Sequence, residues 1–126
     1  MIDALFNDPN YLAGKKVLDA LAVRQEAIAS NIANLETPGY VRVDLAPSFQ
    51  SELERACNSG SPGQIASLKP TLAPDPNAVP NGRDGNTVNL EQEMMNLNQN
   101  TLAHAVETQL LSYSLMKLKM AIAGKS

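Results

Sequence analysis

Both ends of the chain carry long segments in which apolar residues recur at alternating spacings of three and four. This spacing places the apolar side chains on one narrow face of a helix, along which a partner helix can pack. The row in the N-terminal segment consists of Leu18, Leu21, Ile28, Ile32 and Leu35. The row in the C-terminal segment consists of Leu90, Met94, Leu97, Leu111, Leu115, Leu118 and Ile122. The pattern predicts two long helices that pack through these residues, and therefore a mostly α fold.

The ends of the two helices follow from local signals. Asp8 can accept hydrogen bonds from unpaired backbone N–H groups, and Pro9 suits the first helical position. We therefore expect a flexible N-terminus over residues 1–8 and the first long helix over residues 9–36. The second long helix is expected over residues 88–126, because Glu91 and Glu93 are favourable near the positive end of the helix dipole.

A turn, an extended segment and a short helix are predicted for residues 37–60. Pro38 fixes φ at the first central position of a turn, and Gly39 can supply the positive φ of a type II turn at the next position. Apolar and polar residues then alternate from Val41 to Leu45, which is typical of a strand. A short helix follows, with one apolar side formed by Phe49, Leu53 and Ala56.

Residues 61–87 differ from the rest of the chain. They are rich in Pro and Gly, and no apolar periodicity is visible. Such a composition is typical of loops, so we expect an irregular middle insert.

The C-terminal helix carries a second apolar row beside the first. Its members are Met95, Leu102, Val106, Leu110, Tyr113, Met116 and Met120. One partner helix covers only a narrow stripe and cannot bury both rows. Since large apolar surfaces are rarely left exposed, we expect the excess surface to contact other protein subunits.

Composition argues against several classes of function. A formal net charge of −3 and a sequence pI near 5.0 argue against nucleic-acid binding, which needs a basic stripe. Aromatic residues make up only 4% of the chain and Trp is absent, which argues against a pocket for a small-molecule substrate.

No catalytic or metal-binding motif is recognisable. His104 is the only histidine and Cys57 is the only cysteine, and neither has suitable partners at helical spacing. We expect His104 to form a polar layer between helices with Thr101 and Thr108, and Cys57 to be a small semi-buried side chain. The chain is thus predicted not to be an enzyme and to use no cofactor or metal.

No apolar run is long enough to span a bilayer, and the N-terminus lacks the pattern of a Sec-type signal peptide. The sequence therefore favours a cytosolic protein or one exported without a cleaved signal.

Two segments of the chain carry a family resemblance. The first spans residues 29–40, and its core residues are Asn31, Ile32, Ala33, Asn34, Thr37, Pro38, Gly39 and Tyr40. This stretch resembles the N-terminal signature of flagellar rod, hook and related axial proteins. Residues 84–94, 109–112 and 118–122 are similar to the C-terminal helix of a proximal rod subunit. The chain is therefore identified as resembling the flagellar basal-body rod protein family.

The resemblance implies a fold and a function. In such axial proteins the terminal helices form an antiparallel coiled coil, and many copies pack around a channel. The implied role is a structural subunit of the proximal rod that transmits torque and lines the export channel. The implied partners are other copies of the chain, other rod subunits, the MS-ring and the rod adaptor protein.

The resemblance also implies a location. Such a subunit is made in the cytoplasm, passes unfolded through the flagellar type III export apparatus without a cleaved signal, and joins the basal-body rod in the periplasmic space. Asn31 and Asn34 could bind unpaired carbonyls at the helix end or contact a neighbouring chain.

Two alternatives stay open from the sequence. The first is another rod subunit of similar length, which a hairpin-rich insert would favour. The second is a helical export chaperone or adaptor, which should be a stable monomer or dimer without the turn at residues 37–40.

Overall fold

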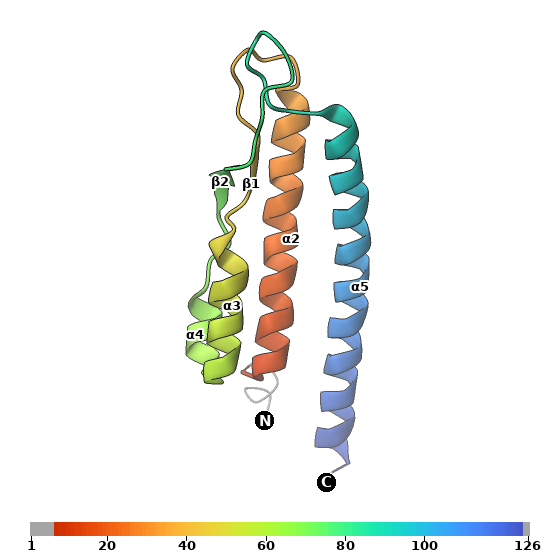
Figure 1. Cartoon of the computed structure of the whole chain (residues 1–126). Helices are drawn as coiled ribbons and strands as arrows, with labels where there is room; N and C mark the ends of the chain where they lie inside the picture. The colour runs from red at the N-terminus through yellow and green to blue at the C-terminus, as the bar shows by residue number, and fades with distance from the viewer. Residues whose placement is uncertain (1–6, 125–126) are drawn as a thin grey trace.

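The computed structural model describes residues 7–124 as a mostly α fold, as the sequence predicts. The elements in chain order are α2 (Pro9–Ala33), β1 (Val43–Leu45), α3 (Ser48–Ser59), α4 (Pro62–Ser67), β2 (Leu72–Pro74) and α5 (Leu90–Ala123). Most of the N-terminus that we expected to be flexible, residues 1–6, and the last two residues expected in the C-terminal helix, 125–126, lie outside the described residues. The two long terminal helices, α2 and α5, are the largest elements (Figure 1).

The ends of α2 are fixed by side-chain caps. At its start, Oδ2 of Asp8 accepts a hydrogen bond from the Tyr11 backbone N–H at 3.2 Å, and Pro9 occupies the first turn. At its end, Asn34 leaves the helical conformation with φ of −106°, and its Nδ2 donates to the Ser30 carbonyl at 2.8 Å. The helix therefore stops at Ala33, three residues before the expected end at residue 36.

α2 and α5 lie side by side and run in opposite directions (Figure 1). Near one end of the pair, Gly14 faces Leu111, and farther along, the Leu21 carbonyl accepts a hydrogen bond from Nδ2 of Asn100 at 3.0 Å. A Cβ atom at Gly14 would lie 3.0 Å from Cδ1 of Leu111 and 3.1 Å from a carboxylate oxygen of Glu107. The absence of a side chain at Gly14 thus lets the two helices approach closely.

The predicted C-terminal row follows the contact with α2 only in part. Leu111, Leu115, Leu118 and Ile122 are partly buried, whereas Leu90 and Met94 are 44% and 45% exposed. A seven-residue repeat falls behind a straight α-helix by about 20° per repeat, or about 80° over the four repeats from 90 to 118. The first residues of the row have therefore rotated away from α2, and Glu93 and Asn100 are buried there instead.

The elements between the two long helices pack on the side of α2 that faces away from α5 (Figure 1). β1 pairs with β2 in antiparallel register, with Val43 opposite Pro74 and Leu45 opposite Leu72. Ala20 and Ala27 of α2 are buried, as is Phe49 of α3. Their small and aromatic side chains form this part of the core.

Residues 61–87, expected to form an irregular insert, are irregular only in part. This insert contains α4 and β2, and Ile65 of α4 is completely buried against the rest of the fold. Both elements are too short to show a period in the sequence, and Pro62 begins α4 rather than interrupting it. The insert contains no hairpin of its own, since its single strand pairs with β1.

Within residues 7–124, no helix combines the length and the apolar character that crossing a membrane would require. α5 is long enough, at 34 residues or about 50 Å, but it carries too many polar side chains.

Candidate functional site

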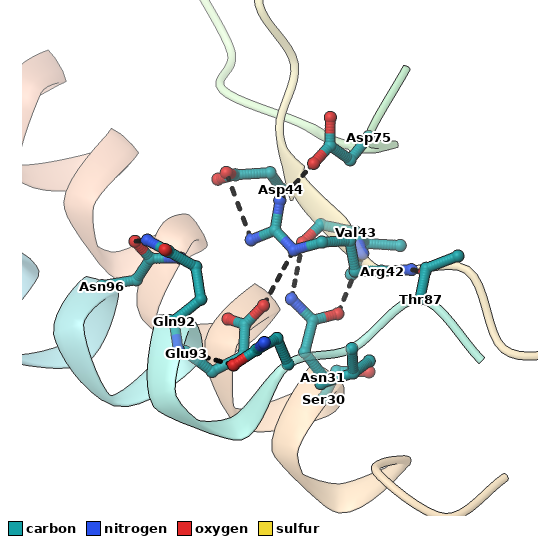
Figure 2. A network of polar contacts seen from close by, with 12 residues as sticks. Ser30, Asn31, Arg42, Val43, Asp44, Asp75, Thr87, Gln92, Glu93 and Asn96 are labelled. Atoms are coloured by element: carbon teal, nitrogen blue, oxygen red, sulfur yellow. Dashed lines mark hydrogen bonds and ion pairs between the residues drawn. The ribbon is translucent and has the colours of Figure 1, made fainter. Parts of the chain in front are cut away.

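A cluster of charged side chains joins three separate parts of the chain around Arg42 (Figure 2). Nε of Arg42 donates to Oε1 of Glu93 at 2.8 Å, and its Nη1 donates to Oδ2 of Asp75. Its Nη2 lies 3.6 Å from Oδ2 of Asp44. These partners come from the start of α5, from the residue after β2 and from β1. We call Arg42, Asp44, Asp75 and Glu93 the Arg42 cluster.

The electrostatics of the cluster favour the ionised forms of Arg42 and Asp75. Burial alone would lower the pKa of Arg42, but hydrogen bonds to Glu93 and Asp75 and the nearby carboxylates raise it above its ordinary value. The pKa of Asp75 is lowered, chiefly by the hydrogen bond that it accepts from the Asn77 backbone N–H and also by Arg42. The cluster therefore stabilises the position of the insert against α5.

Asn31 of α2 lies beneath the cluster and binds β1 through both ends of its amide (Figure 2). Its Nδ2 donates to the Val43 carbonyl at 2.8 Å, and its Oδ1 accepts from the Val43 backbone N–H at 2.9 Å. The hydroxyl of Tyr40 also donates to this Oδ1, at 3.2 Å. The completely buried amide thus takes the place of a neighbouring strand at the edge of β1.

The turn at residues 37–40 is bound by the segment that precedes α5. Gly39 has φ of 71°, and the Tyr40 backbone N–H donates to the Thr37 carbonyl at 3.3 Å. The Gly39 N–H donates to the Asp84 carbonyl at 2.7 Å, and Nδ2 of Asn86 donates to the carbonyls of Asn34 and Thr37 at 2.9 and 2.7 Å. Asn86 therefore bridges two carbonyl groups just beyond the end of α2, each of which also accepts a backbone hydrogen bond within the turn.

The structure thus brings together the two segments that carried the family resemblance, residues 29–40 and 84–94. Of the signature residues, Asn31, Asn34, Thr37, Gly39 and Tyr40 all make polar contacts at this joint. Ile32 and Ala33 lie in the last turn of α2, and Pro38 is exposed in the turn.

Sequence reasoning missed Arg42, Asn86, Glu93 and Asn100. Arg42 and Glu93 are 51 residues apart, and no local pattern relates residues so distant. A signal does exist for Glu93 and Asn100, because both fall on the side of α5 that faces α2 when 3.6 residues per turn are counted from Leu111. Each keeps one buried oxygen without a hydrogen-bond partner, Oε2 of Glu93 and Oδ1 of Asn100.

A second feature is an apolar surface on the side of α5 that faces away from α2. It consists of the second row predicted above, and its seven members are between 51% and 67% exposed. We call this surface the α5 stripe; its members are Met95, Leu102, Val106, Leu110, Tyr113, Met116 and Met120. Nothing in the described part of the chain covers it.

The N-terminal packing residues lie between α2 and its neighbours. Ile28 is buried, and Leu18, Leu21, Ile32 and Leu35 are partly buried, as is Leu97 of α5.

The structure also places the residues considered for chemistry. His104 and Cys57 are exposed, so the semi-buried position expected for Cys57 is wrong. The polar layer between helices expected for His104 with Thr101 and Thr108 is wrong too, because all three residues are exposed. Among residues 7–124, no three His, Cys, Asp or Glu side chains lie together in a way that could hold a metal ion. Within the described residues, the surface suited to contact with another protein is the α5 stripe. The polar contacts between residues 29–40 and 84–94, which we call the polar joint, fix the end of α2 against the start of α5.

Comparison with known proteins agrees with this reading. A family model for flagella basal body rod proteins matches residues 18–40. FlgB of Cereibacter sphaeroides is 34% identical over 112 residues, covering 81% of this chain and 84% of its own length. FlgB of Escherichia coli K12 is 31% identical over 116 residues (78% and 81%), and FlgB of Borrelia hermsii is 28% identical over 125 residues (85% and 90%). The chain belongs to the FlgB family of flagellar basal body rod proteins.

Proposed function

We propose that this chain is a structural subunit of the proximal rod of the bacterial flagellar basal body and assembles through its two terminal helices. The observation that carries the proposal is the α5 stripe, because a helix exposing seven large apolar side chains on one face needs a protein partner. Membership of the rod protein family indicates which kind of partner that is. The family also argues against the alternative of an export chaperone, and the lack of a hairpin in the insert argues against the other rod subunit of similar length.

In the assembled rod, α2 and α5 form an antiparallel coiled coil. The close approach at Gly14 and the partly buried rows on both helices support this arrangement. Supercoiling of the two helices would also rotate Leu90 and Met94 back toward α2. In a supercoil, residues seven apart stay on the same face, whereas on a straight helix they drift around it. Copies of the coiled coil pack around the export channel, and their contacts transmit torque.

The subunit reaches the rod by passing unfolded from the cytoplasm through the flagellar type III export apparatus into the periplasmic space. The absence of a disulfide supports this route, since Cys57 is the only cysteine and the fold needs no oxidation. Its neighbours in the rod are other copies, further rod subunits, the MS-ring and the rod adaptor protein.

The function is tested in a strain whose gene for this chain is deleted. Such cells should build no rod, and a plasmid copy should restore rods that contain the chain in purified basal bodies. The variant Leu102→Asp, which places a charge on the α5 stripe, should be exported but leave the cells without rods. Thr108→Asp is the control, because Thr108 is exposed on α5 outside the stripe. Rods built normally by the deletion strain would refute the function.

A further inference from the structure

An apolar groove lies between α2 and α3. Its volume is about 360 Å³, and its apolar lining consists of Val17, Ala20, Leu21, Leu45, Phe49 and Leu53. The exposed side chains of Arg24, Gln50 and Glu54 complete the lining. The groove is thus apolar inside, and polar groups surround its opening.

The groove and the α5 stripe lie on different faces of the molecule. α3 lies on one side of α2 and α5 on the other (Figure 1). By its register on α5, the exposed stripe faces away from α2. The two apolar surfaces therefore cannot meet within one chain. They can meet between two chains.

The ridge on the C-terminal part of the stripe is comparable with the groove in length. The groove residues of α2 run from Val17 to Arg24, about 11 Å along the helix, and Leu110 to Met116 spans about 9 Å of α5. Leu110, Tyr113 and Met116 are each more than half exposed and form a ridge of the kind that fits between two helices.

The charges also match. Lys117 lies on the same face of α5 one turn after Tyr113, with its Nζ 5.4 Å from the centroid of that ring. Glu54 is the acidic side chain of the groove. When Lys117 is placed beside Glu54, Tyr113 falls beside Gln50, and the apolar ridge covers Phe49 and Leu53, provided that α5 runs parallel to α3.

We propose that the C-terminal part of the α5 stripe, Leu110 to Met120, docks into the groove between α2 and α3 of a second copy of this chain, with Lys117 beside Glu54. This inference rests on the proposed rod function and adds the surface through which copies contact one another.

The direction of the elements supports the docking. α3 and α5 run the same way along the molecule, and both run opposite to α2 (Figure 1). A docked second copy therefore points in the same direction as the first. Since the two surfaces differ, the copy that gives its groove keeps a free stripe and the copy that gives its stripe keeps a free groove, so the contact can repeat from copy to copy around a ring or helix.

Reversing the two charges tests the docking in basal bodies purified from the complemented deletion strain. Lys117→Glu and Glu54→Lys should each reduce the amount of this chain per basal body by about tenfold, because like charges would face each other. The combined variant should restore most of it. Lys119→Glu and Glu52→Lys are matched controls, since both residues are exposed on the same helices but lie outside the stripe and the groove. Normal assembly of both single variants would refute the docking.

A disulfide gives a second test. In a Cys57→Ser background, the pair Gln50→Cys and Tyr113→Cys should form disulfide-linked multimers of this chain on oxidation of basal bodies, of which the smallest is a dimer. Normal rods without that dimer, or with a link to a different subunit, would overturn the docking but leave the rod function intact. If even the unmodified chain were absent from basal bodies, the proposed function itself would fail.

Discussion

Arg42 contacts three carboxylates, but its contact with Glu93 differs from the other two because of burial. The Glu93 side chain is 1% exposed, whereas those of Asp44 and Asp75 are 25% and 19% exposed. A carboxylate so deeply buried is tolerated because a guanidinium group lies against it. At the scale of single residues, the start of α5 is therefore tied to the segment before β1 by this ion pair.

Removing Arg42 should expose this dependence. We expect Arg42→Leu to lower the free energy of unfolding by about 3–5 kcal/mol, since Glu93 is left as an unpaired buried charge. The double variant Arg42→Leu with Glu93→Leu should recover most of the loss. Urea unfolding followed by circular dichroism measures both, and a single variant as stable as the unmodified protein would contradict the expectation.

Asp75 should make stability depend on acid pH. Its pKa is lower in the folded protein than the ordinary value of 3.8, so its contribution is complete above that value. As the pH falls further and Asp75 takes up a proton, the contribution is lost. The unfolding free energies of the unmodified protein and of Asp75→Asn should therefore converge as the pH falls through the lowered pKa of Asp75.

Gly39 is expected to tolerate Asn better than Val. Its φ of 71° is in the left-handed region, which a β-branched residue adopts with strain, and no atom lies within 4 Å of a Cβ built there. The cost of Gly39→Val, about 1–3 kcal/mol, would therefore come from the backbone alone. Equal unfolding free energies for the Val and Asn variants would show that the positive φ at Gly39 does not disfavour a β-branched residue.

At the scale of elements, α5 has two different faces within one turn. Leu111 packs toward Gly14 of α2, whereas its neighbour Leu110 is 56% exposed on the stripe. The first contact holds the subunit together, and the second is available to another chain. The faces can therefore be tested separately.

Adjacent substitutions should separate folding from assembly. Leu111→Asp should lower the free energy of unfolding by about 2–3 kcal/mol, because the charge enters the contact with α2. Leu110→Asp should change it by less than about 0.5 kcal/mol and yet prevent rod formation. Unfolding curves of the monomer and electron microscopy of basal bodies give the two readouts. If Leu110→Asp destabilised the monomer and Leu111→Asp only prevented rod formation, the assignment of the two faces would be wrong.

The same elements explain what the sequence could predict. α2 and α5 are long enough for their apolar period to be visible, and the caps at Asp8 and Asn89 are local signals. α4 and β2 span 6 and 3 residues, too few for a period, so their packing through Ile65 could not be anticipated. The Arg42 cluster depends on contacts across 33 and 51 residues, which only the tertiary fold defines.

At the scale of the whole molecule, the burial of α5 is concentrated toward its start. Asn31, Asn86, Thr87, Val88 and Glu93 are all buried around the polar joint between the end of α2 and the start of α5. Beyond Asn100, no residue of α5 is fully buried up to Ala123. The contacts that hold α5 thus weaken along its length.

Hydrogen exchange of the dilute monomer should follow this gradient. Amides in residues 27–33 and 91–100 should exchange slowly, and those in residues 108–123 should exchange quickly, because they have little buried surface to protect them. In assembled rods the second segment should become protected. Uniform protection of α5 in the monomer would contradict the gradient.

The long separation between Arg42 and its partners also governs when the chain can fold. Asn86, Glu93 and Asn100, which bind the first half of the chain, all belong to the last third of the sequence. Native contacts with such high contact order form slowly and require nearly the entire polypeptide to be free. While one end of the chain is still confined in a narrow passage, one partner of each of these contacts is not available to the other. The topology therefore postpones folding until nearly the whole chain is free.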